Sequence, residues 1–413
     1  MQRKRIAVIG AGPSGMMAAI RASQLNQAVT LFERNSILGR KLLLSGKGRC
    51  NITNACSLDL FLKRFSKNGE FLRSAFAKFF NQDLIDFFKD RGLELKTERQ
   101  LRVFPVTDSS ASIVEVLKKE LIKNNVEIIY KINVSDIAIE KGEVRGVVLE
   151  NGDFIPYDIV IMATGGISYS FTGSNGDGLG MINKKGHSII ALRPGLVPLE
   201  TKEDYPKDLE GLTLENIQLK FYSGKDEINS EVGDLIFTSF GISGPLIITL
   251  SGKISDWMAQ GKEVNLVMDL KPGLTKEQLD ARFLREFKEN AKKGLKSVMK
   301  TMLPLRMVNL FIKMSKIALD KKVSQITQKE RGELVSLLKG WKFNIKGVRP
   351  IEEGMVTRGG ISLKEINPRT MESRLIKGLY FCGEMIDIDA DTGGFNLQAA
   401  FSTGYLAGEG AAQ

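Results

Sequence analysis

A glycine-rich turn near the start of the chain constrains the fold more than any other feature. The β-branched run at 6–9 ends in Gly10-Ala-Gly12-Pro-Ser-Gly15, helix-forming residues follow, and a second strand is expected at 28–32. Gly10 permits a tight turn, Gly12 lets the backbone approach a pyrophosphate, and Gly15 lets the helix pack on the strand. This order predicts a β-turn-α-β unit that binds a dinucleotide at the N-terminus of its helix.

An acidic residue closes the second expected strand. Glu33 lies 18 residues after Gly15, close to the spacing of about 20 at which a ribose-binding acid is expected. A carboxylate there accepts hydrogen bonds from both ribose hydroxyls. A glycine-rich turn without a ligand is the alternative, and the complete strand, turn, helix and acid argue against it.

A second glycine motif lies at the far end of the chain. A short strand ends in Gly383-Glu384, and the stretch from Asp391 to Gln398 leads into a helix rich in alanine and glycine. A small nicotinamide-dependent dehydrogenase needs no such element. FAD does, because its flavin end must be held far from its adenine. A helix that begins near Asn396 also points N–H groups at the flavin and stabilises negative charge on the reduced ring. We therefore expect FAD.

The order of the elements predicts several domains, since 413 residues exceed what one hydrophobic core usually fills. Helix and strand alternate to about Leu192, short strands follow to about Leu270, helices occupy 275–340, and the alternation returns near Gly354. This order fits a Rossmann-like domain interrupted by two inserted modules. The expected parts are the FAD-binding domain in two pieces (1–190 and 356–413), a β-rich insertion (191–270), a basic helical subdomain (271–340) and a return strand of the β-rich domain (341–355).

Composition excludes several kinds of chemistry. The only histidine is His187, which removes His-based metal sites and most Ser-His or Cys-His hydrolase schemes. The three cysteines have no metal-ligand spacing, so no metal site is expected. The net charge of +11 is concentrated at 282–349, where 18 Lys and Arg face 5 Asp and Glu.

Hydropathy argues against a membrane protein. No apolar run approaches the roughly 20 residues that cross a bilayer. The basic start of the chain is followed only by the short apolar run at 6–9 and has no cleavage site. We expect a cytoplasmic protein without a membrane span.

Four stretches together resemble a bacterial family of NAD(P)/FAD-dependent oxidoreductases that includes aminoacetone-oxidase-like and 3-dehydro-bile-acid-reductase-like flavoproteins. The resemblance runs nearly from end to end. The stretches are 10–15, 39–51, 357–363 and 383–398. It implies an α/β fold with an FAD-binding domain of glutathione-reductase type, an inserted β-barrel-like domain and a helical subdomain. Ser45-Gly-Lys-Gly replaces the more usual Ser-Gly-Gly-Gly, which affects only the surface of that loop.

The resemblance also implies where the cofactor lies. Glu33 would hold the adenosine ribose, Val134 would meet the adenine through its backbone, and Glu384 would lie at the ribityl–flavin end. The full set of expected cofactor-binding residues is Gly10, Ala11, Gly12, Pro13, Ser14, Gly15, Glu33, Arg34, Arg40, Lys41, Gly48, Cys50, Asn51, Val134, Ala163, Thr164, Gly165, Gly383, Glu384, Asp391, Asn396 and Leu397.

Several residues have a structural and a functional interpretation. For Arg40 and Lys41, ligand contact is favoured over plain solvation, because both lie in a glycine-rich loop beside a phosphate-binding fold. Cys50 is expected to be a small buried residue rather than a redox thiol, and His187 to be structural. The stretch 241–245 predicts a helix start, either as an ordinary cap or as an anion site facing the flavin. The six phenylalanines at 70–91 have near-helical spacing and are expected to form a packing face.

The main functional hypothesis is a flavin oxidoreductase. NAD(P)H would bind transiently at the interface of the inserted domain and reduce FAD, which a small organic acceptor or oxygen would reoxidise. The protein would supply positioning and electrostatics. No catalytic acid or base is assigned. The alternatives are a flavin-dependent factor that binds or acts on nucleic acid through the basic helical subdomain, and a sensor that binds FAD without turnover. The oligomeric state is not predicted.

Overall fold

The computed structural model describes residues 3–413. Contacts divide the chain into two compact units, one formed by the chain up to Gly195 together with Pro350–Gln413, and the other by Leu196–Arg349. The finer boundary expected near residue 270, between a β-rich and a helical part, stays a prediction.

A five-stranded parallel sheet forms the centre of the first unit. Its order is β20-β10-β1-β2-β6, and every neighbouring pair is parallel. Its apolar, largely buried strands have the character of a sheet covered on both faces. The strands are β1 (Arg5–Ile9), β2 (Ala28–Glu33), β6 (Glu127–Tyr130), β10 (Ile159–Met162) and β20 (Leu379–Phe381). The last strand, β20, pairs with β10 next to β1, so the two glycine motifs end at the same edge of one sheet.

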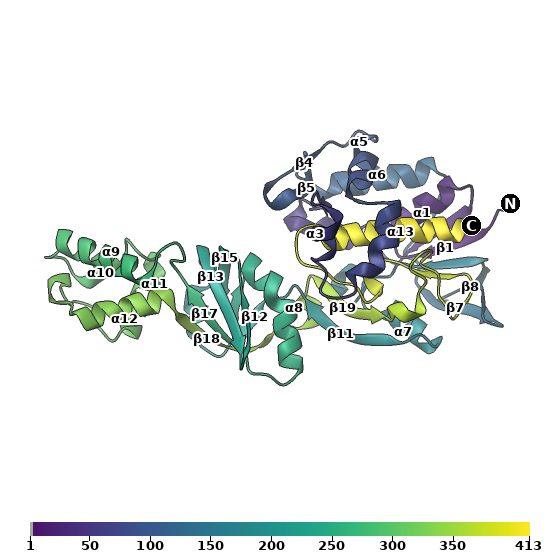
Figure 1. The fold of residues 1–413 in the computed structure, drawn as a ribbon. Coiled ribbons are helices and arrows are strands. Elements are labelled where there is room, and N and C mark those ends of the chain that lie inside the picture. The colour runs from purple at the N-terminus through teal and green to yellow at the C-terminus, as the bar shows by residue number, and fades with distance from the viewer. Residues whose placement is uncertain (1–2) are drawn as a thin grey trace. The chain divides into compact units, whose positions relative to one another are not determined.

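Two helices from opposite ends of the chain pack closely in this unit. Helix α1 (Pro13–Gln24) and helix α13 (Phe395–Ala412) run side by side (Figure 1). A Cβ on Gly404 would lie 2.2 Å from the Ser14 carbonyl oxygen, and one on Gly408 would lie 2.4 Å from that of Ala18. Only glycine permits this approach, which ties α13 to the helix of the N-terminal motif.

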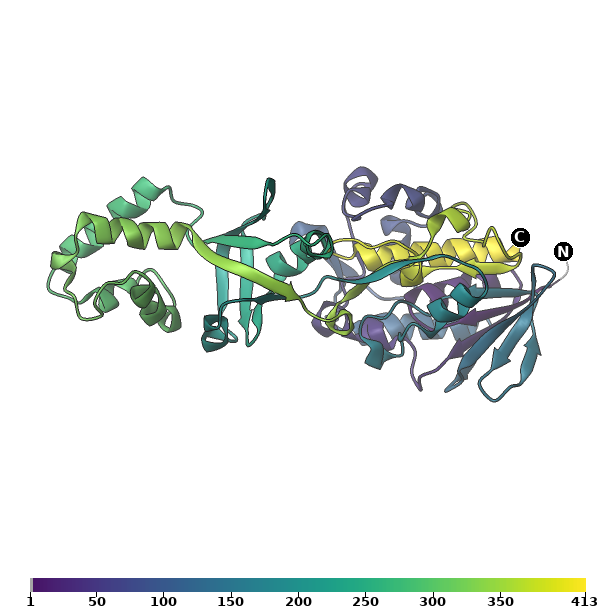
Figure 2. The same ribbon diagram turned by 90° about the horizontal axis from the view of Figure 1, so that it is seen from below.

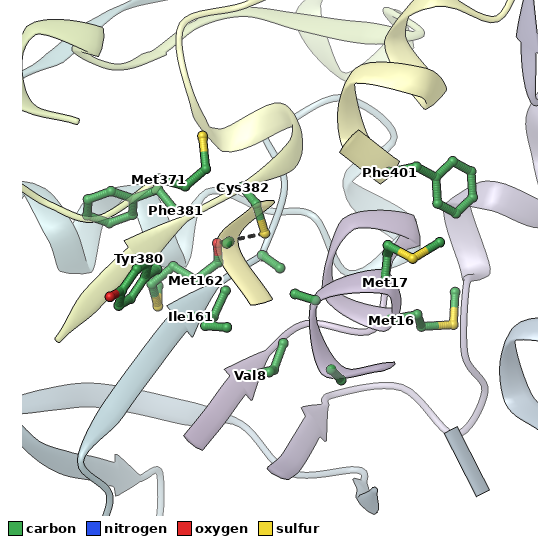
Figure 3. Packing of buried hydrophobic residues seen from close by; sticks show 14 of the residues in the cluster. Val8, Met16, Met17, Ile161, Met162, Met371, Tyr380, Phe381, Cys382 and Phe401 are labelled. Carbon is green, nitrogen blue, oxygen red and sulfur yellow. Dashed lines mark hydrogen bonds between the residues drawn. The ribbon is translucent and has the colours of Figure 1, made fainter. Parts of the chain in front are cut away.

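An apolar core lies between the sheet and these helices. Figure 3 shows side chains of β1, β10 and β20 facing α1 and α13. Phe381 and Phe401 are fully buried. Cys382 is also buried, directly after β20, and its thiol lies 3.7 Å from the Met162 carbonyl oxygen.

The remainder of the first unit surrounds the sheet. The expected meander is present as β7 (Val134–Glu140), β8 (Glu143–Leu149) and β9 (Phe154–Pro156). The phenylalanines near 70–91 contact other rings, as in the 5.0 Å pair Phe76–Phe80, and form the expected packing face. The other elements are β3 (Thr53–Asn54), β4 (Leu95–Thr97), β5 (Arg102–Pro105), β11 (Ile189–Gly195), β19 (Val356–Ile361), α2 (Arg40–Leu44), α3 (Leu58–Leu62), α4 (Arg73–Lys78), α5 (Asn81–Lys89), α6 (Ser110–Lys123) and α7 (Asp177–Lys184).

The second unit contains a closed antiparallel barrel. Its strand order is β14-β13-β15-β16-β12-β18-β17, and a further β13–β17 pairing closes the ring, with β14 outside it. The strands are β12 (Leu199–Thr201), β13 (Thr213–Ser223), β14 (Asp226–Asn229), β15 (Gly233–Thr238), β16 (Gly241–Ser243), β17 (Asn265–Asp269) and β18 (Trp341–Val348). The expected β-barrel-like insertion is therefore present.

Helices accompany the barrel. Four of them follow β17 and gather at one end of the sheet, and β18 leads back from them (Figure 2). They are α9 (Lys276–Glu289), α10 (Leu295–Met299), α11 (Leu305–Met314) and α12 (Gln328–Lys339). A further helix, α8 (Pro245–Ala259), begins at the expected start and interrupts the stretch read as short strands. Among residues 3–413, no helix is long and apolar enough to cross a bilayer.

Candidate dinucleotide site

Four strand ends converge at the carboxyl edge of the parallel sheet. The turn at Gly10 follows β1, Glu33 ends β2, Ala163 follows β10 and Gly383 lies after β20. Ligands of open α/β sheets bind outside this edge. Most of the expected cofactor-binding residues lie on these four ends or on the segments next to them.

The glycines of the first turn have the roles that their spacing predicts. Gly10 has φ 100°, and a Cβ there would lie 2.6 Å from the Ala163 carbonyl oxygen. A Cβ on Gly15 would lie 1.9 Å from the Gly10 carbonyl oxygen, so this residue lets the helix approach the strand. A Cβ on Gly12 would meet no protein atom within 4 Å. The front of helix α1, where Gly12, Pro13 and Ser14 offer its N-terminus, therefore has the form that a pyrophosphate requires.

The Glu33 carboxylate is buried and held by the backbone. One oxygen accepts hydrogen bonds from the backbone and side-chain nitrogens of Asn35, at 2.8 and 2.7 Å, and the other accepts one from the Ala11 N–H at 2.8 Å. A carboxylate has about four acceptor positions, so the second oxygen keeps one for a ribose hydroxyl. The geometry fits the role expected of Glu33.

Arg34 forms protein contacts instead of projecting freely. Its guanidinium donates to the Asn133 side chain and to Asp177 at 2.7 Å each, and to the Gly173 carbonyl at 3.1 Å. These bonds order the segment 173–177 beside the start of β7, where Val134 is buried. Arg40 is exposed and donates only to the Asn35 side chain, at 2.9 Å, among the described hydrogen bonds.

A polar network surrounds Glu384 at the end of β20. Its carboxylate pairs with Lys41 and accepts bonds of 2.7 Å from the Ser168 hydroxyl and the Thr357 N–H. Lys41 also donates to the Ser168 hydroxyl at 2.7 Å. Burial alone would raise the pKa of Glu384, but the Lys41 charge and these bonds outweigh it and hold the pKa below its ordinary value. The network joins α2, β19 and the end of β20 around an ionised carboxylate.

The glycine-rich loop expected at 39–51 is a short helix followed by a series of tight turns. Arg40 and Lys41 begin the short helix α2, and Gly48 follows with φ 84°. Cys50 is fully buried with φ 62°, and burial raises the pKa of its thiol to about 12. It is thus a protonated packing residue, as expected. The Asn51 side chain accepts a 3.2 Å bond from the Val103 N–H, which fixes the turn to β5.

The N-terminus of α13 is held close to this segment. Gly394 has φ 96°, and a Cβ there would lie 2.3 Å from the Thr53 carbonyl oxygen. The Asn396 side chain bonds both backbone groups of Ala390, at 2.8 and 2.9 Å, so it shapes the loop before the helix and Leu397 follows it into α13. The Asp391 Oδ2 lies 3.7 Å from a guanidinium nitrogen of Arg64. Burial raises the pKa of the Asp391 carboxyl to about 6.

A hydroxyl without a hydrogen-bond partner in the described part of the chain lies behind the end of β10. Thr164, between Ala163 and Gly165 after β10, has a buried Oγ1 with no hydrogen-bond partner within residues 3–413. This hydroxyl packs against α7, since a Cβ on Gly178 would lie 2.0 Å from it. With the open front of Gly12 and the free acceptor of Glu33, the residues fit an extended dinucleotide such as FAD.

His187 has a structural role. It is buried, and its ring nitrogens lie 3.0 Å from the Glu365 carboxylate and 3.0 Å from the Ser373 hydroxyl. This resembles a hydrolase triad, but the Ser373 hydroxyl also accepts bonds from the N–H groups of Leu375 and Ile376, which shows that it stabilises a turn.

Sequence reasoning missed three residues of the site. Ser168 and Thr357 complete the Glu384 network, and Asn35 holds the Glu33 carboxylate. Thr357 lies in one of the four family-like stretches, which was a usable signal. Ser168 is far from both glycine motifs in the sequence, and no local pattern indicates it.

The fold and this site define a Rossmann-type dinucleotide-binding flavoprotein. The chain belongs to the HI0933-like Rossmann-domain protein family, whose model matches residues 4–410. This confirms the resemblance and the FAD-binding fold expected from the sequence, and it places the chain among the oxidoreductases.

Individual relatives cover almost the whole chain. The 3-dehydro-bile acid delta(4,6)-reductase of Clostridium scindens is 29% identical over 412 residues, 99% of each chain. The ribosomal RNA dihydrouridine synthase of Haemophilus influenzae is 31% identical over 403 residues, 96% of each chain. Among solved structures, Mycobacterium smegmatis Sdh1 in complex with UQ1 matches 100% of this chain and 69% of its own, with a TM-score of 0.50 at 14% identity, which shows a likeness of fold alone.

Proposed function

We propose that this protein is an FAD-dependent reductase that uses NAD(P)H to saturate a carbon–carbon double bond conjugated with a carbonyl group. The observation that carries the proposal is the meeting of both glycine motifs at one sheet edge, around Gly12, Glu33 and Glu384. The names of two relatives agree in chemistry: one is a delta(4,6)-reductase, and dihydrouridine is uridine with its C5=C6 bond saturated. Bound FAD supplies the hydride transfer.

The chain's own residues would bind and orient the cofactor. The α1 N-terminus would hold the pyrophosphate, and the remaining acceptor position of Glu33 would hold the ribose. Glu384, kept ionised by Lys41, would accept hydrogen bonds from ribityl hydroxyls. The α13 N-terminus would place N–H groups near negative charge on the reduced ring.

Anaerobic reduction tests the proposal. The purified protein should show flavin absorption that bleaches on mixing with NADH or NADPH, and the colour should return with an α,β-unsaturated ketone but not with its saturated analogue. Glu33→Ala should lose FAD, whereas Glu150→Ala, an exposed glutamate of the same unit, should retain it. A protein that binds FAD but does not bleach would be a sensor, and the reductase proposal would fail.

A second candidate for the acceptor is uridine within structured RNA. The basic surplus of residues 282–349 favours it, because many of these cations lie on the surface. Lys288, Lys292, Lys293, Lys313 and Lys316 are exposed and form no ion pair within residues 3–413. Cations without partners attract phosphate backbones and release counterions on binding.

Salt dependence tests this second candidate. Fluorescence anisotropy of a labelled RNA hairpin should show binding. The logarithm of the association constant should fall linearly with the logarithm of the salt concentration. Absence of binding at low salt would leave a small molecule as the acceptor. A cytoplasmic location, expected from the sequence, stays a prediction.

A further inference from the structure

A surface cavity of about 560 Å³, open to solvent, lies beside helix α9 in the second unit. It is lined by Leu274, Gln278, Ala281, Arg282 and Arg285. The last four recur at helical spacing, so they lie along one face of α9. The opposite face carries buried apolar residues of the second unit's core: Leu279, Phe283 and Phe287. One face of α9 therefore packs on the core of the second unit, and the other face borders the cavity.

The cavity is lined by two arginines whose charges are not taken up in ion pairs among residues 3–413. Neither Arg282 nor Arg285 has an ion pair within the described part of the chain. Two aspartates of the neighbouring sequence pair with other cations. Asp280 pairs with Arg331 through bonds of 2.5 and 3.1 Å, and Asp269 pairs with Lys339 at 2.6 Å.

A third cation strengthens this field. Lys271 is half-buried, and burial together with the charge of Arg282 lowers the pKa of its ammonium group. Glu286 and Glu289 lie four residues after Arg282 and Arg285 on α9, but neither forms an ion pair with these arginines among residues 3–413. Like charges held together in this way favour an anionic ligand.

We propose that this cavity binds phosphate groups of an RNA backbone. Two guanidinium groups present N–H forks that match phosphate oxygens, and the Gln278 amide supplies further donors. The phosphates of NADPH share this chemistry. RNA is favoured because α9 also carries Lys288, which lies three residues after Arg285, is exposed and forms no ion pair within residues 3–413. A long polyanion can engage this lysine together with the two arginines. The inference rests on the RNA candidate of the proposed function.

The test compares two charge-matched double variants in the full-length flavoprotein. Arg282→Gln/Arg285→Gln removes the two guanidinium groups that line the cavity. Lys202→Gln/Lys207→Gln, the control, removes two exposed cations of the same unit outside the basic segment. With a labelled RNA hairpin, the arginine variant should bind at least about tenfold more weakly, and its salt slope should fall by about 2. The lysine control should change affinity less than about threefold. Arg282→Lys/Arg285→Lys should keep most of the salt slope but lose affinity, because lysine lacks the planar fork.

The outcomes separate the site from the function. If the wild type binds RNA and the arginine variant binds equally well, the cavity is not the site, although the RNA candidate survives. If RNA binding is unchanged or absent in both proteins, and the arginine variant instead loses affinity for NADPH but not for NADH, the phosphate comes from the cofactor and the inference fails. If the wild type binds no RNA and neither nucleotide is affected, both the RNA candidate and the inference fail. Matching thermal unfolding of the variants establishes that the fold is intact.

Discussion

Two glycines three residues apart in the first turn should respond to alanine in opposite ways. Gly12→Ala adds a methyl group that meets no protein atom within 4 Å, at a backbone with φ −74° that alanine adopts freely. Gly15→Ala places its methyl group 1.9 Å from the Gly10 carbonyl oxygen, so strand and helix must separate. The first change should affect the cofactor, and the second should affect the fold.

The magnitudes follow from these contacts. Overpacking of this kind costs about 1–3 kcal/mol, which lowers the thermal midpoint of a unit of this size by about 2–12 °C. Gly12→Ala should move the midpoint of the FAD-free protein by less than about 2 °C, since it creates no protein clash. Its methyl group separates the backbone from the pyrophosphate, and we expect FAD affinity to fall at least about tenfold, or ~1.4 kcal/mol.

Thermal unfolding of the FAD-free proteins and fluorescence titration with FAD measure the two effects. Gly180→Ala, at a helical glycine of α7 with open space around it, is the matched control: it should leave FAD affinity unchanged and should not lower the midpoint, since alanine favours the helix over glycine. Wild-type FAD affinity in Gly12→Ala would refute the placement of the pyrophosphate. An unchanged midpoint in Gly15→Ala would refute the close packing of α1 on β1.

Three further predictions concern ionisable groups. Asp391 has a pKa raised to about 6, so its ionisation disfavours the folded state increasingly from pH 3.8 to 6. Asp391→Asn should therefore stabilise the protein at pH 7.5 by about 1 kcal/mol, a value reduced to allow for solvent screening of the partly exposed carboxyl. The substitution should have no effect below pH 3.8. Equal effects on the melting temperature at both pH values would contradict this prediction. Burial lowers the pKa of His187 below 6.5, so the folded state favours the neutral imidazole ring. The contribution of His187 to the free energy of unfolding is therefore fully present above pH 6.5 and declines as the pH falls below it. His187→Gln should flatten this acid-side decline in the melting temperature, and an unaltered profile would exclude His187 as its source. Lys41→Met should destabilise the protein by about 2 kcal/mol by leaving Glu384 without its cation, and adding Glu384→Gln should recover much of the loss; additive effects in this double-mutant cycle would show that the pair is not coupled.

The cofactor-binding turn could be predicted from the sequence because its contacts are local. Strand, turn, helix and acid follow one another within residues 5–33, so hydropathy and glycine spacing suffice to indicate the unit. The β-rich insertion, the helical segment, the structural role of His187 and the burial of Cys50 also follow from local patterns and composition, whereas the barrel form of the insertion was expected from the family resemblance. The cavity beside α9 could not be predicted from the sequence, because the charge of its arginines depends on which carboxylates pair with other cations.

The sequence by itself determined the class of the protein: the βαβ turn, the acid at Glu33 and the second glycine motif that marks a flavoprotein. Only the tertiary structure decided how the site is assembled. Lys41 and Glu384 are 343 positions apart, and they meet because β20 returns beside β10 and because glycines let α13 lie against α1. Local propensity carries no information about such pairings, since they depend on which strands become neighbours and which backbones approach closely. For this reason Ser168 emerged only from the folded chain.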